Sequence, residues 1–336
     1  MQLKEIITVL EQMAPTAYAE DFDNVGLLVG DKNLNVTGIL VCHDALESVI
    51  DEAVEKGCNL VVCFHPIIFS GMKKLTGKTY VERAVIKAIR NDVAIYAVHT
   101  GLDNHPDGVN KILCNALGLN NTQILMPKKS FIQKLTTFVP VANSQSVTQA
   151  LFSAGAGAIG NYDNCSFISQ GTGSFKGNEA SNPVYGNKGA FEKVEEHKIE
   201  VVFEKHLQAQ VIKALFEAHP YEEVAHHIQQ LENNLQTVGL GMVGYLDTDM
   251  EELDFLKFVK KKCETGSVRH SDLLNKKIKK VAVLGGSGSF AIGAAKAINA
   301  DVLVTSDLKY HDFFQAEGTI LLADVGHFES ERYVKN

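Results

Sequence analysis

Three buried apolar runs of this sequence each end in a histidine, and two of these histidines have an acid four residues later. The residues are His65, His99 with Asp103, and His327 with Glu331, and a fourth apolar run ends just before Asp307. In a helical turn, side chains four residues apart share one face and reach a single ion. Histidine and carboxylate together suit zinc, iron, manganese or nickel. A carboxylate can also bridge two ions about 3.5–4 Å apart, as in two-metal hydrolytic sites.

The histidines could instead have a purely structural role and bind no metal. A single histidine at a strand end often only caps or hydrogen-bonds the backbone, and one His-x-x-x-acid pair is close to chance in 336 residues. Two such pairs and His65, all at the carboxyl ends of expected strands, favour a metal site. Ligands of open parallel sheets bind at that edge. We therefore expect one or two divalent ions there.

Residues 285–289 (GGSGS) join an expected strand to an expected helix. Glycine amides in this position can hold an anion, but the GK[ST] of a Walker loop is missing. Two interpretations stay open at this point: a tight strand-to-helix turn, and an anion-holding loop in a shared cleft.

Alternating apolar and amphipathic segments predict the elements that position these residues. Expected strands at 37–42, 60–64 and 93–98 alternate with expected helices at 44–56, 81–91 and 107–117. From about residue 235 the alternation returns, with strands at 281–284, 300–305 and 319–325 and a helix at 291–298. Such alternation predicts α/β lobes with mostly parallel sheets. The fold class is therefore α/β, with two lobes that share a metal cleft.

The segment between the two lobes has a different order. Expected strands at 133–139, 162–169, 196–204 and 222–230 enclose expected helices at 144–154 and 207–218. The order β-α-β-β-α-β is typical of a ferredoxin-like α+β domain. We expect an N-terminal lobe at 1–127, this insert at 128–232 and a C-terminal lobe at 233–336.

Composition excludes several classes of protein. The formal net charge of -8 argues against a nucleic-acid surface, which needs a basic face. Residues 1–13 predict an amphipathic helix instead of a secretory signal, and no apolar run reaches the roughly 18 residues of a membrane span. The six cysteines show no CxxC and are expected to be reduced. A cytoplasmic protein without membrane contact is expected.

Several segments of both lobes resemble the dinuclear-metal-centre hexamer family, whose members are described as GTP cyclohydrolase I type 2 homologues and as Ngg-interacting-factor-like proteins. The segments are EDFDNVGLLVGD (20–31), FHPIIF (64–69), AVHTGLDN (97–104), GGSGSF (285–290), TSDLKYHD (305–312) and DVGHFESE (324–331). In the insert, IGNYDNCSF (159–167) and AHPYEEVAHHI (218–228) resemble the PII-like, CutA-like domain of the longer members. The resemblance implies a toroidal homohexamer with metal pairs in internal clefts.

The resemblance also implies roles for single residues. The implied metal ligands are His65, Asp103, His327 and Glu331, with His99 as a further ligand or near neighbour and Glu331 shared between ions. Asp23, Asn24, Asp44 and Asp307 match family positions beside the site. Family members commonly show two adjacent histidines before the proline, but here the first is Phe64. One ion is therefore expected to lack a ligand.

Two functions of different classes follow. The first is a metal-dependent hydrolase of a nucleotide or other phosphate-bearing small molecule, with GTP ring opening implied by the family name alone. In it, His99 or His311 carries protons, and negative charge is held by Gly285, Gly286, Ser287, Gly288, Ser289 and Lys309. The alternative is a non-catalytic, metal-binding hexameric assembly or regulatory protein that senses a ligand or partner through the insert.

Overall fold

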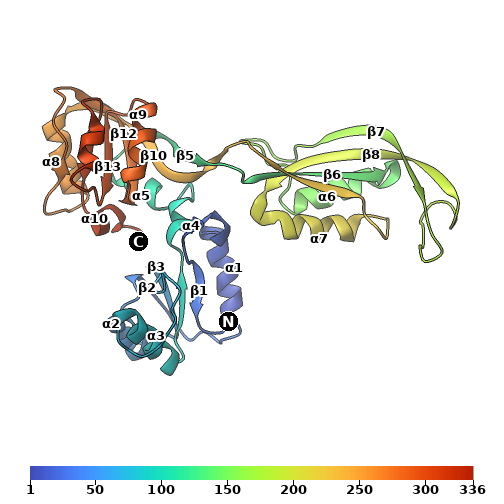
Figure 1. Cartoon of the computed structure of the whole chain (residues 1–336), viewed down its shortest axis with the longest axis horizontal. Coiled ribbons are helices and arrows are strands. Elements are labelled where there is room, and N and C mark those ends of the chain that lie inside the picture. The colour runs from blue at the N-terminus through green and yellow to red at the C-terminus, as the bar shows by residue number, and fades with distance from the viewer. Residues whose placement is uncertain (336) are drawn as a thin grey trace. The chain divides into compact units, whose positions relative to one another are not determined.

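A computed structural model describes residues 1–335 of the chain (Figure 1). The chain divides into two compact units, one made of Met1–Pro127 with Thr237–Asn336 and the other of Lys128–Gln236. The insert expected at 128–232 lies within the second unit, which extends four residues further, and residues 1–127 and those from Thr237 onward belong to the first. Among residues 1–335 there is no helix with the length and apolar character that crossing a bilayer demands.

The first sheet of the larger unit has four strands in the order β1-β4-β3-β2. These are β1 (Gly26–Val29), β2 (Ile39–Asp44), β3 (Leu60–His65) and β4 (Ala94–Ala97). The strands β2, β3 and β4 are parallel, and β1 runs antiparallel to β4. The carboxyl ends of β2, β3 and β4 therefore meet at one edge.

Helices cover both faces of this first sheet. They are α1 (Leu3–Met13), α2 (Glu47–Glu55) and α3 (Tyr80–Arg90). Leu60, Val62 and Tyr96 pack against α1, whereas Val61, Cys63 and Ile95 pack against α2 and α3. Because side chains alternate along a strand, a continuous apolar run such as that of β3 needs a covering layer on each side.

The second sheet of the same unit has six strands in the order β11-β14-β13-β12-β10-β5. They are β5 (Asn120–Lys128), β10 (Leu235–Glu251), β11 (Arg269–His270), β12 (Lys277–Ser287), β13 (Val302–Ser306) and β14 (Leu321–Asp324). The central strands β12, β13 and β14 are parallel, while β10 and β11 run antiparallel to their partners. Helices α5 (Val109–Ala116) and α8 (Glu252–Lys262) cover one face and α9 (Ile292–Ala297) covers the other.

The helix α5 packs on the second sheet. Its position in the chain, within residues 1–127, instead predicts packing on the first sheet. Leu113, Cys114 and Leu117 contact the core that contains Val283 and Val304. Amphipathic spacing shows that a helix has an apolar face, but not which sheet covers that face. The strands β5 and β10 were not expected either, so the boundary placed at residue 127 falls at the end of a strand of the second sheet.

Short helical turns follow several strands at the carboxyl edges of both sheets. The turns α4 (His99–Asp103) and α10 (His327–Glu331) follow β4 and β14, and 3-10 turns lie at η1 (Thr16–Tyr18), η4 (Ser289–Ala291) and η5 (Asp312–Ala316). Both predicted His-x-x-x-acid pairs are therefore helical.

The second unit has the predicted element order β-α-β-β-α-β. Its elements are β6 (Ile132–Pro140), η2 (Val141–Asn143), α6 (Ser144–Ser153), β7 (Phe167–Lys176), β8 (Phe191–Glu204), η3 (Lys205–Leu207), α7 (Gln208–Ala218) and β9 (His226–Leu231). The sheet order is β7-β8-β6-β9, with α6 and α7 on the same face (Figure 1). The strand β7 continues beyond the expected end at residue 169, because residues 170–176 also pair with β8. Backbone ladder bonds form despite the glycines there.

Candidate metal centre

One carboxylate oxygen of Glu331 is contacted by three imidazoles. Its Oε2 atom lies 3.3 Å from the Nε2 atoms of His43, His65 and His327. The Glu331 side chain is only 2% exposed. These contacts lack the direction of hydrogen bonds, so Oε2 has no hydrogen-bond partner within residues 1–335. Four atoms that commonly ligate metals thus converge at a buried point.

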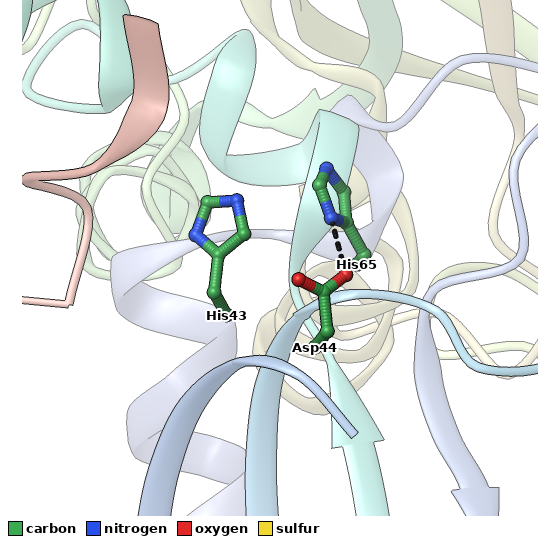
Figure 2. A group of neighbouring side chains, drawn as sticks. All are labelled: His43, Asp44 and His65. Atoms are coloured by element: carbon green, nitrogen blue, oxygen red, sulfur yellow. Dashed lines mark hydrogen bonds and ion pairs between the residues drawn. The ribbon is translucent and has the colours of Figure 1, made fainter. Parts of the chain in front are cut away.

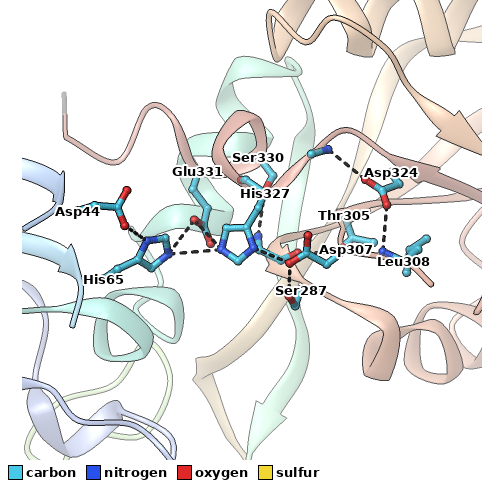
Figure 3. Close-up of polar contacts among 12 residues, drawn as sticks. Asp44, His65, Ser287, Thr305, Asp307, Leu308, Asp324, His327, Ser330 and Glu331 are labelled. Carbon is cyan, nitrogen blue, oxygen red and sulfur yellow. Dashed lines mark hydrogen bonds and ion pairs between the residues drawn. The ribbon is translucent and has the colours of Figure 1, made fainter. Parts of the chain in front are cut away.

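Strand register and helix geometry bring these side chains together from both sheets. Asp44, at the end of β2, is the register partner of His65 at the end of β3. Figure 2 shows the rings of His43 and His65 rising side by side from these two strand ends. His327 begins α10 and Glu331 ends it, so their side chains lie on one face of the turn (Figure 3).

Three histidines are each held at Nδ1 by a carboxylate. The pairs are His65 with Asp44 at 2.9 Å, His327 with Asp307 at 2.7 Å and His99 with Asp23 at 2.9 Å. A carboxylate at Nδ1 fixes the ring orientation and leaves Nε2 for a metal, as in carboxylate–histidine–metal triads. Asp44, Asp307 and Asp23 thus lie beside the histidines and can orient their rings.

Asn24 supports this arrangement from behind. Its backbone N–H donates to Asp23 Oδ1 at 2.7 Å, and its side-chain amide donates to the carbonyl of Ile68. The hydroxyl and backbone N–H of Thr100 also donate to Asp23. The carboxylate that holds His99 is thus fixed by its own neighbours.

The turn α4 places His99 and Asp103 beside the cluster. The ring centroids of His99 and His65 are 5.3 Å apart. The Asp103 carboxyl is buried, and within residues 1–335 its Oδ1 has no hydrogen-bond partner. Two groups of side chains have ligand atoms within 4.8 Å of one another: His43, Asp44 and His65, and His65, His327 and Glu331. His99 and Asp103 fall outside both groups, so the predicted ligand set is brought together only in part.

The charges of the cluster shift its proton affinities. Burial opposes ionisation of Glu331, but the contacts with His327, His43 and His65 outweigh it and hold the pKa of this carboxyl well below its usual range. Burial lowers the pKa of His65, yet contacts with Asp44 and Glu331 raise it to about 9. The contact with Glu331 is the main cause that raises the pKa of His327 to about 9. Burial, aided by the charge of Glu331, raises the pKa of Asp103 well above its usual value.

The prediction of an anion-binding loop is wrong for its first two residues, Gly285 and Gly286. The N–H of Gly285 donates to Asn110 Oδ1 and that of Gly286 donates to Ser330 Oγ, both at 2.9 Å. These amides are therefore not available to an anion. Gly286 has a φ of +73°, and a Cβ there would lie 2.5 Å from Glu331 Oε1. The glycine thus leaves space for the carboxylate of Glu331.

The other residues of that loop, and Lys309 and His311, also do not form the predicted anion site. The Ser287 hydroxyl donates to Asp307, Gly288 donates to the carbonyl of Ser306 at 3.4 Å, and Ser289 opens η4. Lys309 and His311 are exposed, and the ring of His311 packs against Tyr310 and Phe314. His311 is in neither candidate metal group, so its predicted role as a proton carrier has no geometric support.

A cavity of about 550 Å³ opens beside the centre within the larger unit. Asp44 and His65 line one side of it, and Lys73 and Lys74 line another. Both lysines are exposed, so their ammonium groups are free to meet a solute. The cationic side chains beside the histidines are therefore Lys73 and Lys74, and Lys309 does not line this cavity.

His43 is a residue of the site that is absent from the ligand set expected from the sequence. This residue follows the apolar run at 37–42 in the same way that His65 follows its run, so the same rule of strand ends would have found it. The six cysteines are free, and burial of Cys63 raises the pKa of its thiol. Free thiols are consistent with the expectation of reduced cysteines.

Comparisons with known proteins agree with the resemblance. The sequence model of a family described as Duf34/NIF3 (NGG1p interacting factor 3) matches residues 1–336. A Bacillus subtilis protein named "GTP cyclohydrolase 1 type 2 homolog" is 41% identical over 99% of this chain and 89% of its own length. A Staphylococcus aureus protein of the same name is 35% identical over 98% of this chain and 89% of its own.

Solved structures show the same relationship. The structure of a Bacillus cereus protein related to NIF3 matches with a TM-score of 0.85 and 40% identity, over 98% of this chain and 89% of that one. The Staphylococcus aureus protein SA1388 matches with a TM-score of 0.76 and 32% identity, over 98% of this chain and 88% of that one.

Proposed function

Because this chain belongs to the Duf34/NIF3 (NGG1p interacting factor 3) family, we propose that it binds divalent metal ions and uses them to hydrolyse a phosphate-bearing small molecule such as a nucleotide. The name that the relatives share, GTP cyclohydrolase 1 type 2 homolog, makes GTP the first substrate to test. Zinc, iron, manganese and nickel all suit a donor set of imidazole and carboxylate.

One observation carries the proposal: three imidazole Nε2 atoms converge on the buried Oε2 of Glu331. The Nε2 atoms of His65 and His327 also face each other at 3.4 Å. Oε2 of Glu331 has no hydrogen-bond partner within residues 1–335, so its lone pairs are available to a cation between these groups. His65, His327 and Glu331 would hold the ion.

The residues around the centre have separate tasks in this proposal. When bound, a divalent ion would act as a Lewis acid that polarises a substrate oxygen and lowers the pKa of a water molecule. Asp44 and Asp307 keep the rings of His65 and His327 in position. His99, held at Nδ1 by Asp23, keeps its Nε2 for accepting a proton.

The cavity beside His65 gives the substrate a place. Its volume of about 550 Å³ is in the usual range of small-molecule sites, roughly 300–1,000 Å³. Lys73 and Lys74 would attract the phosphates, since they carry positive charge on the wall of the cavity. The substrate class is therefore anionic and small.

The test is an assay of the purified protein, reconstituted with each metal, against GTP and a panel of phosphoesters. We expect turnover that depends on metal and that falls at least about 100-fold in Glu331→Gln, since a shared ligand is lost. Glu329→Gln is the matched control, because Glu329 lies in the same turn but in neither metal group. Absence of turnover with every metal, or full activity of Glu331→Gln, would overturn the enzymatic proposal.

A cavity in the second unit favours a regulatory role as the second candidate function. It has a volume of about 690 Å³ and is lined by residues 169–178 of the β7 region together with Glu196, Lys198 and Tyr221. Tyr221 donates a hydrogen bond of 2.7 Å to the buried Glu196. In this candidate the second unit is a PII-like, CutA-like sensor of a small ligand, and the metal centre has a structural task.

Ligand binding by the second unit distinguishes the two candidates. A thermal-shift screen of nucleotides and metabolites should reveal a compound that raises the Tm of the full chain and loses its effect in Tyr221→Phe. Loss of the effect in Glu331→Gln instead would place the compound at the metal centre and contradict the sensor role.

We also propose that copies of the chain assemble as a homohexamer. Two aromatic side chains near the centre, Phe22 and Phe69, are 67% and 51% exposed and contact each other. Neighbouring exposed rings favour a contact between copies of the chain, because removal of apolar surface from water lowers the free energy. Light scattering after size exclusion should give about six times the chain mass of 36.7 kDa. A monomer at micromolar concentration would contradict this proposal.

A further inference from the structure

His43 is a buried histidine whose ring nitrogens have no hydrogen bonds. The residue is 8% exposed, and neither Nδ1 nor Nε2 has a hydrogen-bond partner within residues 1–335. His65, His99 and His327 differ, because each has a carboxylate at Nδ1. A buried imidazole without partners is costly, so the position of His43 calls for an explanation.

The surroundings of His43 point its ring at the metal centre. Its Nε2 lies 3.3 Å from Glu331 Oε2, and its ring centroid is 4.7 Å from that of His65. Its ligand atom also lies within 4.8 Å of those of Asp44 and His65. Figure 2 shows His43 and His65 extending in the same direction from neighbouring strand ends.

Aromatic rings hold His43 in this orientation. The rings of Phe64 and Phe328 each lie with their centroids 5.3 Å from the His43 ring. Phe64 is itself 2% exposed and has no atom that could ligate a metal. The side chain at 64 therefore packs against the imidazole at 43.

Asp103 is a second buried group without a hydrogen bond. Its Oδ1 has no hydrogen-bond partner within residues 1–335, but its ligand atoms belong to neither group of close ligand atoms. Within residues 1–335, the buried side-chain atoms without hydrogen bonds include both ring nitrogens of His43 and Glu331 Oε2. An imidazole and a carboxylate in contact, as His43 and Glu331 are, are donors suited to a divalent transition metal.

We propose that His43 is a metal ligand and that, with the shared Glu331, it holds a second ion in place of the histidine that Phe64 does not provide. The inference rests on the proposed metal centre, but it concerns only the second of two ions. It replaces the expectation that one ion lacks a ligand. The ligand lies on β2 instead of β3, and the two strands are neighbours.

The first test is metal content. The protein is dialysed against Zn²⁺ or Co²⁺, and ions per chain are measured by elemental analysis. We expect about two ions in the natural sequence and about one in His43→Leu, since a single donor set is lost. His227→Leu is the control, because His227 is an exposed histidine of the second unit and should leave the metal content unchanged.

A swap variant tests the replacement directly. In His43→Leu combined with Phe64→His, the imidazole returns at the position of the packed ring, and we expect about two ions again. Restoration would support replacement of one histidine by the other. A metal content that stays near one ion in the swap while it is near two in the natural sequence would contradict this part of the inference.

A measurement on the natural sequence avoids the risk that a variant does not fold. Zinc is titrated into protein labelled with ¹⁵N-histidine, and the ring nitrogens of His43 are followed by NMR. A large shift of Nε2 at the second equivalent of zinc is expected. An unchanged His43 signal at saturation, or two ions bound by folded His43→Leu, would overturn the inference and leave the first ion intact. Absence of any bound metal would overturn the proposed function as well.

Discussion

The Nε2 atom of His65 lies 3.3 Å from Oε2 of Glu331, and this contact joins the carboxyl edges of two different sheets. His65 ends β3 of the first sheet, and Glu331 ends the turn that follows β14 of the second. A metal bound here would therefore link the two halves of the larger unit.

Gly286→Ala should weaken metal binding. The added Cβ would lie 2.5 Å from Glu331 Oε1, and the φ of +73° is unfavourable for alanine. We expect metal affinity, measured by calorimetry, to fall roughly 10–100-fold because the shared ligand is displaced. Gly293→Ala is the control, since a Cβ there has open space and Gly293 lies within α9. Equal affinities of both variants would contradict the steric argument.

Asp307→Asn should weaken metal binding through His327. The carboxylate holds Nδ1 of His327 at 2.7 Å, whereas an amide can present a donor there and disturb the ring orientation. We expect a loss of affinity of roughly 10–100-fold, which is typical of partners that orient metal ligands. Asp312→Asn, in the neighbouring turn η5, should bind metal with unchanged affinity. A folded Asp307→Asn protein with full affinity would show that His327 needs no orienting group.

The stability of the metal-free protein should fall between pH 6.5 and pH 9. His65 and His327 have folded-state pKa values raised from 6.5 to about 9. Such groups stabilise the fold fully below their unfolded pKa, and the contribution is lost as the pH rises through the folded pKa. The Tm of metal-free protein should therefore decrease over this range.

Metal should reverse this pH dependence. An ion at the histidines replaces their protons, so metal affinity rises as the pH approaches 9. With excess zinc, the Tm should be constant or rise from pH 6.5 to pH 9. A metal-free protein whose Tm does not change over that range would contradict the assignment of raised pKa values to His65 and His327.

Asn110→Leu should destabilise the larger unit. The Asn110 side chain donates to the carbonyl of Asp103 at 3.0 Å and accepts from the N–H of Gly285 at 2.9 Å. Both backbone groups would be left unpaired, at a cost of about 1–3 kcal/mol each. Urea unfolding without metal should show the loss. Asn115→Leu is the control, because Asn115 is an exposed residue of the same helix.

The larger unit should fold and bind metal without the insert. The strands that carry the connections lie together, since β10 and β5 are hydrogen-bonded neighbours in the second sheet. Replacement of residues 128–236 by a short Gly-Ser linker should therefore keep the metal content of the full chain. An unfolded product, or one without metal, would mean that the second unit supports the centre.

Local sequence determined the elements that carry the site. The continuous apolar run of β3 required a strand covered on both faces, and it ended at His65 as expected. The spacing of His327 and Glu331 placed both on one face once residues 327–331 formed a helical turn. Period and spacing are local properties, so they can be recognised without knowledge of the fold.

Tertiary structure decided which of these residues meet. The apolar face of α5 packs on the second sheet, although its position in the chain favoured the first, because burial depends on the partner surface. Gly286 could have bound an anion, but its space is filled by Glu331. His43 gains its place from the parallel pairing of β2 and β3. Contacts between distant segments depend on how whole elements pack together. The spacing of residues along one segment carries no information about that packing.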